Sequence, residues 1–395
     1  MSLRAQGEEV LLLMKIRPFL SHKREDALVV TRLKATLRLY GAGGWKDTDD
    51  LRVGAHTPAA IRRAILEETG GFIWWGTHKA LSSEMINELE IPTALERADA
   101  QPVYPLVPVF ANISPGTDRA IIGEAIGEHT EDFLNRNGIV RGKSEAAGDL
   151  RRRIAQRYVW DAVRSIAGDP ATVAFRALSE ASGDNDLTFD WRAIFDEKTR
   201  QLAAGSIPIM LDALANARGA FQGRSASQRL RLDLDLPLPL AFLVGYEWRI
   251  TTRLRIGFRQ RTGSSYAWID ADGPVAEAPL PKTKSFVRDG PAVVAISCKD
   301  PLGRPACRYA EEISASKLVT LHEPGLIDSR RMRTLARTGA AELRALNDWG
   351  VEKHLLIRGP TSMAAMVGAA SNACGPVTAP FWNGMRYVSP IVVGS

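Results

Sequence analysis

Cysteine is scarce in this chain of 395 residues, which contains only Cys298, Cys307 and Cys374. The number is odd, and no two of the three are spaced as a CxxC pair. Such a set favours neither a disulfide framework nor a structural zinc site. We therefore expect no bound metal, and a reducing cytoplasm is the simplest location for the protein.

Long hydrophobic runs are also missing. No apolar stretch approaches the roughly 20 residues that cross a bilayer. The segment VLLLMKI near the start is short and is followed by no small-residue cleavage site, so we expect neither a secretory signal nor a membrane partner. Formal net charge is only +6. This modest excess suits an anionic ligand, although scattered surface charges explain it equally well, and we expect no DNA partner.

The first 110 residues alternate short apolar runs with helical patterns. The runs EVLLLMKIRPFLS, GFIWW and VYPLVPVF indicate buried strands, and REDALVVTRLKATLRLYG and AAIRRAILEE have the apolar spacing of amphipathic helices. Strands that alternate with helices predict a parallel sheet with helices on both faces. Residues 117 to about 180 have a mostly helical, strongly charged pattern.

The order of these segments resembles a TIR domain, which has a flavodoxin-like fold. The resemblance rests on Phe19 and Ser21 after the first strand, on a loop with Trp45 and Asp47, and on the apolar strand that contains Pro108. Many bacterial TIR domains cleave NAD+ between nicotinamide and ribose. The resemblance implies that NAD+ is the substrate and that it is held by a set of residues around the first strand, the loop and the later helix: Phe19, Ser21, Lys23, Trp45, Asp47 and Ser82.

The segment WWGTHKALSSEMINELEIPTALERA supplies the candidate carboxylates. Cleavage of the nicotinamide bond builds oxocarbenium character on the ribose, which a nearby carboxylate stabilises. Matched without gaps to the family's Ser-x-Trp-x-x-x-Glu pattern, this segment has Ser82 at the serine position and Glu88 at the position of the catalytic glutamate. Glu84 stands where the family has tryptophan. Glu84 and Glu88 share one helix face, whereas Glu90 lies about 200° from Glu88 around an α-helix and is the weakest candidate. We therefore keep both Glu84 and Glu88 as catalytic candidates, with a solvated first helical turn as the alternative.

The second half of the chain has a different pattern. RLRLDLDL alternates leucine with charged residues, and AVVAIS and HLLIRGP each indicate a buried strand followed by a helix. The two strand-then-helix segments suggest two Rossmann-like halves. We place the first domain, with its connecting helices, at residues 1–165 and the second at residues 166–395.

This half resembles the SAVED domain, a sensor of bacterial anti-phage cyclic-oligonucleotide signalling (CBASS). The resemblance rests on GYEWRI, GFRQR, VVAIS, APFWNGMRYVSP and above all HLLIRGP, which spans His354–Pro360. It implies two fused CARF-like Rossmann units that bind a cyclic di- to tetranucleotide, of which a cyclic trinucleotide is our first choice.

The residues themselves also suit an anionic ligand. In RLRIGFRQR the odd positions are arginines and the even ones are apolar, so a strand here would have an arginine face that suits phosphates and bases, or else a solvated outer face. A helix that follows RGP would direct free backbone N–H groups at a phosphate, or would be an ordinary strand-to-helix turn. The predicted ligand residues from these segments and from the end of AVVAIS are Arg253, Arg255, Arg259, Gln260, Ser297, Lys299, Arg358, Gly359, Pro360 and Thr361.

Together the two resemblances imply an effector in which a cyclic oligonucleotide is the activator. The ligand drives head-to-tail self-association into an oligomer or filament, and neighbouring TIR domains then complete an NAD+ hydrolysis site. Two alternatives stay open. The TIR domain could act only as a ligand-gated scaffold. Alternatively, the second half could degrade its cyclic ligand, although no acidic cluster or metal motif in that half supports this.

Overall fold

The structure is a computed structural model that describes most of the chain. The described residues are 16–46, 57–166, 168–179, 185–224, 229–249, 253–262, 265–287, 289–325, 328–347 and 350–394. They divide into two compact units. Unit 1 comprises Met1–Ala171, Ser182–Asp190 and Asn216–Ala226, and unit 2 comprises Thr172–Ala181, Trp191–Ala215 and Ser227–Ser395. None of the described helices is long and apolar enough to cross a membrane.

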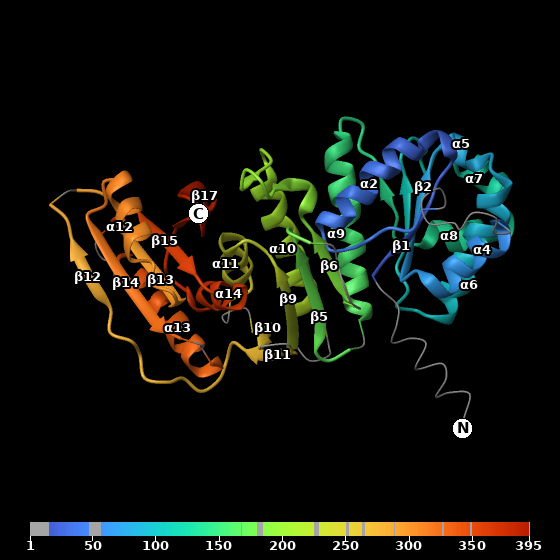
Figure 1. The fold of residues 1–395 in the computed structure, drawn as a ribbon. Helices are drawn as coiled ribbons and strands as arrows, with labels where there is room; N and C mark the ends of the chain where they lie inside the picture. The colour runs from blue at the N-terminus through green and yellow to red at the C-terminus, as the bar shows by residue number, and fades with distance from the viewer. Residues whose placement is uncertain are drawn as a thin grey trace, which may run out of the picture. The chain divides into compact units, whose positions relative to one another are not determined.

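Unit 1 alternates strands and helices (Figure 1). Its elements are β1 (Pro18–Ser21), η1 (Arg24–Asp26), α2 (Ala27–Leu39), α4 (Thr57–Arg63), η2 (Ala64–Glu68), β2 (Gly71–Gly76), α5 (His78–Leu81), η3 (Met85–Glu90), α6 (Ile91–Ala100), β3 (Leu106–Phe110), α7 (Arg119–Ile126), η4 (Gly127–His129), α8 (Thr130–Asn135), β4 (Ile139–Val140), α9 (Ala147–Ser165) and β6 (Leu187–Asp190).

The sheet of unit 1 is parallel, as the sequence predicted. Its strands follow the order β1-β2-β3-β4. Trp45 forms an isolated parallel bridge with Phe19, on the side of β1 away from β2. The segment at Trp45 thus pairs with one side of β1, and the later strand β2 pairs with the other side. This is the strand order of a flavodoxin-like sheet. The strand order therefore reverses at β1.

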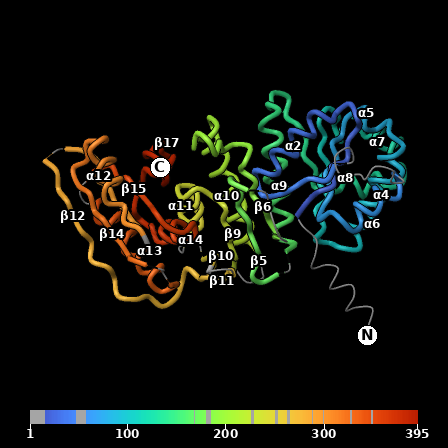
Figure 2. Tube along the Cα trace, in the orientation of Figure 1, coloured from blue at the N-terminus to red at the C-terminus, as the bar shows by residue number. Residues whose placement is uncertain are grey.

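The two faces of this sheet are covered by different helices. Phe19, Phe72 and Trp74 point to one face, where they form a buried cluster with residues of α4, α6 and α8. On the other face Gly71 lies against the ring of Tyr158 in α9. Figures 1 and 2 show α2 and α9 together on this second side. Alternate residues of each strand therefore point to opposite helix layers, so Ser21 shares the side of Phe19.

Unit 2 contains strands of two larger sheets and the two-stranded sheet β7-β8. Its elements are β5 (Ala171–Arg176), η5 (Arg192–Ile194), β7 (Phe195–Asp196), β8 (Gln201–Leu202), part of α10 (Ser206–Gln222), β9 (Arg229–Asp235), α11 (Leu238–Glu247), β10 (Arg255–Thr262), β11 (Ser265–Asp270), β12 (Lys282–Ser285), β13 (Ala292–Lys299), α12 (Gly303–Glu312), β14 (Lys317–Pro324), α13 (Ser329–Ala345), β15 (Lys353–Arg358), α14 (Thr361–Ala370), β16 (Val377–Trp382) and β17 (Tyr387–Val393).

Each of the two larger sheets contains a parallel strand-helix-strand segment, β9-α11-β10 in one and β15-α14-β16 in the other. The helices α11 and α14 pack against each other through glycine. A Cβ on Gly245 would lie 1.9 Å from the carbonyl oxygen of Ala365, and one on Gly368 would lie 2.2 Å from that of Phe242. Two Rossmann-like halves are therefore joined by a close helix crossing. AVVAIS and HLLIRGP, which the sequence assigned to separate halves, are instead the neighbouring strands β13 and β15 of one sheet.

The pattern of residues 117 to about 180 was mostly helical, and here the prediction is incomplete. The helices α7, α8 and α9 are present, but the segment ATVAFR forms β5. Its threonine, valine and phenylalanine favour a strand, and all its side chains except Thr172 are buried. The strand was missed because it is short and follows directly on a long charged helix, α9.

His354, which begins the HLLIRGP motif, forms a buried polar cluster at the start of β15. Its Nδ1 lies 2.8 Å from the hydroxyl of Tyr309, and its Nε2 lies 2.9 Å from Oε1 of Glu352. Burial lowers the pKa of His354, against the opposing effect of Glu352. The folded state therefore holds this ring neutral at a pH where the unfolded chain would protonate it.

This predicts a pH-dependent contribution to stability. Because the pKa of His354 is lower in the folded state, its contribution is complete above the ordinary histidine pKa of about 6.5 and is lost as pH falls toward the folded pKa. When the pH is lowered from 7 to 5, the melting temperature of His354→Gln should fall by less than that of wild type. The exposed His78, substituted in the same way, is the control. Equal pH sensitivity in wild type and His354→Gln would contradict the assignment.

Candidate functional sites

The six-stranded sheet of unit 2 has a strand-order reversal that positions a cleft. Its order is β12-β14-β13-β15-β16-β17, and β13 pairs in parallel with both β14 and β15. The chain passes from β13 to β14 on one side and then crosses to β15 on the other. Ligands of open α/β sheets bind at the carboxyl ends of the strands at such a reversal.

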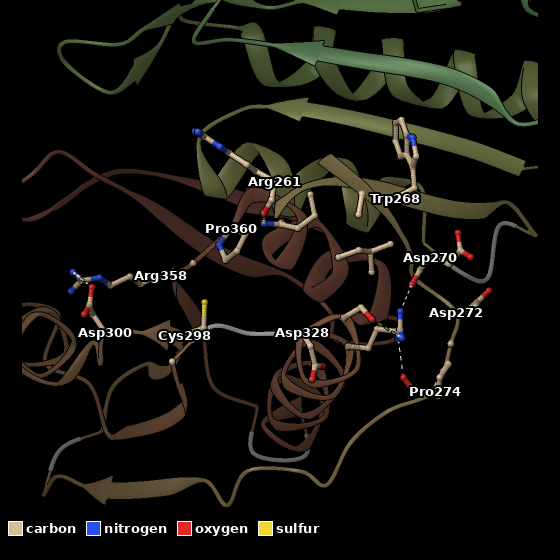
Figure 3. Close-up of a pocket in the computed structure, with 18 residues that line it drawn as sticks. Arg261, Trp268, Asp270, Asp272, Pro274, Cys298, Asp300, Asp328, Arg358 and Pro360 are labelled. Carbon is tan, nitrogen blue, oxygen red and sulfur yellow. Dashed lines mark hydrogen bonds and ion pairs between the residues drawn. The ribbon is translucent and has the colours of Figure 1, made fainter. Parts of the chain in front are cut away.

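A cleft of about 920 Å³ lies at this point, within the range of small-ligand sites (Figure 3). One side is formed by the ends of β13 and β15 and the start of α13, and the other by β10, β11 and the chain that follows β11. The lining residues are Gln260, Arg261, Ala267, Trp268, Ile269, Asp270, Asp272, Gly273, Pro274, Cys298, Asp300, Gly325, Asp328, Ser329, Arg333, Arg358, Gly359 and Pro360.

Arg333 fixes the wall of the cleft that follows β11. Its guanidinium donates to the backbone carbonyls of Pro274 at 2.9 Å and Asp270 at 3.1 Å, and to the hydroxyl of Ser329 at 3.3 Å. The side chain is buried, and burial lowers the pKa of Arg333. A buried arginine that is held by carbonyls supports the cleft and is not available as a mobile surface charge.

Arg358 has a different environment at the opposite end of the cleft. It is the last residue of β15 and forms an ion pair with Asp300 at 3.3 Å, with about half of each side chain exposed. An exposed ion pair of this kind contributes little stability, so its guanidinium can turn to a ligand at low cost. Figure 3 shows this pair beside Cys298 and Pro360.

Two helices begin at the cleft. Asp328 caps α13 by accepting from the backbone N–H of Arg331 at 2.8 Å, and Pro360 precedes α14. Gly359 leaves space for the strand-to-helix turn, because a Cβ there would lie 2.8 Å from Sγ of Cys298. The exposed N–H groups at a helix start attract anions, and here this effect adds to the charge of Arg358.

The structure brings some of the predicted ligand residues together and separates the others. Gln260, Arg358, Gly359 and Pro360 line the cleft. Thr361 lies on a smaller neighbouring pocket of about 310 Å³. Ser297 is buried on the opposite face of β13 from Cys298, where its hydroxyl lies 3.1 Å from Nδ1 of His322. The side chain of Lys299 lies outside the described part of the structure.

The predicted arginine face exists, but of its arginines only Arg261 lines the cleft. Arg255 and Arg259 lie on one face of β10, and Gln260 lies on the other face, which meets the cleft. Arg253 precedes the strand and is exposed. Arg259 pairs with Asp233 at 2.9 Å. The sequence showed the alternation but could not show which face of the strand the cleft would use.

Comparisons with known proteins identify the class of unit 2. The structure is similar to that of the Acinetobacter baumannii Cap4 SAVED/CARF-domain containing receptor with the cyclic trinucleotide 3′3′3′-cAAA, with a TM-score of 0.50, 13% identity, and 87% of this chain and 86% of that chain covered. The corresponding receptor of Moraxella osloensis aligns with a TM-score of 0.47 and 12% identity over 94% of this chain and 86% of that chain.

The family model of the SAVED domain, described as "SMODS-associated and fused to various effectors sensor domain", matches residues 214–379. None of the curated proteins matches the chain. Residues 214–379 are thus a SAVED domain, and the fold has the Rossmann-like, CARF-type architecture of such receptors. This segment contains every residue that lines the cleft.

In unit 1 the strand order reverses at β1, and polar side chains meet at this end of the sheet. The hydroxyl of Ser21, the last residue of β1, donates to Oε2 of Glu90 at 2.6 Å, and both residues are buried. Just after β2, the hydroxyl of Thr77 donates to Oδ2 of Asp26 at 2.9 Å. Two carboxylates are therefore held by hydroxyl donors at the carboxyl ends of adjacent parallel strands. Among the described residues, no group of three His, Cys, Asp or Glu side chains could hold a metal.

The predicted NAD+ contacts are only partly brought to this end of the sheet. Ser21 is there and is buried, and Lys23 follows β1 and is half-buried. Phe19 and Trp45 stack on each other at 4.7 Å and are both 2% exposed, so they pack in the core and have no free face for a ligand ring. Ser82 is exposed, and its hydroxyl donates to the carbonyl of Lys79. Asp47 lies outside the described residues.

The three glutamates of the acidic helix differ in burial. Glu84 and Glu88 are exposed, whereas Glu90 is 7% exposed and faces Ser21. The sequence ranked Glu90 last because that ranking assumed α-helical spacing. Residues Met85–Glu90 instead form a π-helical segment with i→i+5 hydrogen bonds, which rotates Glu90 toward the sheet. Pro92 was the available signal, since it has no N–H to bond the carbonyl of Glu88 and so disrupts α-helical pairing there.

Proposed function

We propose that unit 2 is a sensor that binds a cyclic oligonucleotide, and specifically a cyclic trinucleotide, in the cleft between β13, β15 and the β10–β11 hairpin. The observation that carries this proposal is the cleft itself, which lies at the strand-order reversal inside the matched SAVED segment. The receptor with a similar fold was solved with a cyclic trinucleotide.

The lining chemistry supports a nucleotide ligand. Arg358 and the start of α14 suit phosphate oxygens, while Trp268 offers a planar surface to a base. The carboxylates of Asp270, Asp272 and Asp328 would repel a phosphate placed beside them. They instead suit the exocyclic amino group of adenine, because a carboxylate accepts from such a donor. Phosphates are therefore expected at the Arg358 end and bases at the Asp272 end.

Removal of Arg358 should weaken ligand binding strongly. A hydrogen bond to a charged group contributes about 1.5–3 kcal/mol, so Arg358→Ala should raise the Kd for 3′3′3′-cAAA by roughly 10- to 100-fold in calorimetric titration. Arg304→Ala removes the same charge from an exposed position on α12 that does not line the cleft, and it should bind like wild type. An unchanged Kd for Arg358→Ala would place the ligand elsewhere.

We propose further that unit 1 hydrolyses NAD+ to nicotinamide and ADP-ribose products once the ligand has driven copies of the chain to associate head to tail. The order of its motifs, the flavodoxin-like strand order and the buried Glu90 beside the end of β1 support an NAD+ site. Glu90 joins Glu84 and Glu88 as the carboxylate that stabilises oxocarbenium character on the ribose, and its position beside Ser21 favours it. A composite site would keep single copies inactive until assembly.

One experiment separates this reading from a scaffold and from a ligand-degrading enzyme. The full chain is incubated with NAD+, alone and with cyclic di-, tri- and tetranucleotides, while nicotinamide release, ligand integrity and particle size are followed. The proposal expects nicotinamide and larger particles only with the right ligand, which stays intact. Larger particles without nicotinamide would identify a ligand-gated scaffold, and loss of the cyclic ligand would identify a nuclease.

A further inference from the structure

The arginine face of the β9-β10-β11 sheet lies outside the cleft except at its edge, where Arg261, Trp268 and Asp270 also line the cleft. We define it as the residues whose side chains point away from α14: Arg229, Arg231, Asp233, Arg255, Gly257, Arg259, Arg261, Tyr266, Trp268 and Asp270. The strand register places them on one side, since Arg229 is opposite Arg255 and Arg259 is opposite Trp268. The apolar residues between them, such as Leu232 and Phe258, are buried on the other side. In Figure 3, Arg261 and Trp268 extend away from Cys298 and Asp328.

The charge of this face is strongly positive. It has five guanidinium groups and two carboxylates, which leaves three positive charges. One of the carboxylates, Asp233, already accepts from the buried Arg176 as well as from Arg259. Arg229, Arg231 and Arg255 are exposed, and no carboxylate among the described residues forms an ion pair with them. An extended anion could therefore neutralise all three without displacing an internal partner.

Aromatic rings lie between these charges. The guanidinium of Arg231 lies over the ring of Trp268 at 5.2 Å, and that of Arg259 lies over the ring of Tyr266 at 4.1 Å. Both rings are partly exposed, with Trp268 at 38% and Tyr266 at 58%. In each pair the planar guanidinium lies over the planar aromatic ring, and this contact limits the motion of the arginine side chain. Such planes are surfaces on which unpaired bases stack.

We propose that the arginine face binds single-stranded nucleic acid, with phosphates along Arg229, Arg231 and Arg255 and bases against the two arginine–aromatic pairs. Residues two apart on a strand are separated by roughly 6.6 Å, and neighbouring strands by roughly 4.8 Å, so the face presents a regular grid of donors and planes. An acidic peptide has no bases to stack on the two arginine–aromatic pairs, and the bases of a duplex are not accessible for such stacking. The proposal departs from our expectation of no DNA partner, and it gives Arg255 and Arg259, which the sequence assigned to the cyclic ligand, a different ligand.

The proposal is tested by fluorescence anisotropy of the full chain with labelled oligonucleotides of about 12 nucleotides, as RNA and as DNA, across a salt series. Wild type should bind single strands more tightly than the matched duplex. In Arg229→Ala/Arg231→Ala/Arg255→Ala, the slope of log K against log salt should fall by about 2, since each lost phosphate contact on a single strand removes about 0.7. Tyr266→Ala and Trp268→Ala should each weaken binding by about tenfold at constant slope. The tighter of the RNA and DNA arms names the natural source.

A matched control keeps the test specific. Arg304→Ala/Arg308→Ala/Arg386→Ala removes the same charge from exposed positions outside this face and should bind oligonucleotides like wild type. The proposal is overturned by an equal loss in both triple variants, by equal binding of duplex and single strand, or by binding of phosphatidylserine vesicles without binding of oligonucleotides. The first triple variant should keep wild-type affinity for 3′3′3′-cAAA, because Arg229, Arg231 and Arg255 do not line the cleft. Loss of both ligands together would make these three arginines part of the cleft site and would also overturn the proposal.

Discussion

Glu90→Gln should abolish nicotinamide release while leaving the affinity for the cyclic ligand unchanged. The substitution keeps the size and burial of the side chain, and an amide can still accept from Ser21 Oγ. It removes only the negative charge that would face the oxocarbenium-like ribose. Loss of a preorganised electrostatic contact of this kind typically lowers turnover by about 100- to 1,000-fold. Nicotinamide release at saturating cyclic trinucleotide measures the effect.

Glu84→Gln and Glu88→Gln are the matched comparisons. The sequence favoured these two residues, but both side chains are exposed to water, which weakens the interaction of their charge with the substrate. We expect each variant to retain activity closer to that of wild type than Glu90→Gln does. Ser21→Ala should lower kcat more than it changes KM, since it removes a donor that positions the Glu90 carboxylate. Full activity of Glu90→Gln together with an inactive Glu84→Gln or Glu88→Gln would restore the original assignment.

Gly245→Ala should destabilise unit 2 severely. The new Cβ would lie 1.9 Å from the carbonyl oxygen of Ala365, and backbone cannot move aside as the end of a flexible side chain can. Overpacking of this kind costs about 3 kcal/mol, which lowers the melting temperature of a unit of this size by on the order of 10 °C. Gly368→Ala should have a similar effect because it disturbs the same crossing of α11 and α14.

The control for these substitutions is another helical glycine. A Cβ on Gly303, at the start of α12, meets no atom within 4 Å, so Gly303→Ala should raise stability slightly by its helix propensity. If Gly245→Ala melted like Gly303→Ala, the crossing would be looser than the structure describes. Because α14 begins at the cleft, Gly245→Ala should also weaken binding of the cyclic trinucleotide.

The sequence predicted the elements of the fold well where their hydrophobic period was strong. GFIWW, AVVAIS and HLLIRGP appear as β2, β13 and β15, and the amphipathic run after Ser21 appears as α2. These segments carry their own signal, because a buried parallel strand is apolar throughout and an amphipathic helix has one apolar face. The short strand β5 followed a long charged helix and was missed.

The sites were harder to predict, for two physical reasons. Alternation in RLRIGFRQR established that the arginines share a face, but the choice of face for the cleft depends on how β10 packs against α14, which is a tertiary contact. Glu90 was ranked last because the sequence contains no direct record of a π-helical segment, and a change from i→i+4 to i→i+5 bonding rotates every later side chain. By contrast, Arg358, Gly359 and Pro360 lie together at the cleft, because a strand-to-helix junction fixes their place at the strand end, and their ligand contacts stay a prediction.

The central claim is that the cleft of unit 2 is a cyclic-oligonucleotide sensor. Calorimetric titration of the full chain with 3′3′3′-cAAA tests it most directly, with Arg358→Ala and Arg304→Ala titrated in parallel. The account predicts saturable binding to wild type and Arg304→Ala and a Kd raised by roughly 10- to 100-fold for Arg358→Ala. Absence of binding to wild type by any cyclic di-, tri- or tetranucleotide, or equal affinity in all three proteins, would contradict it.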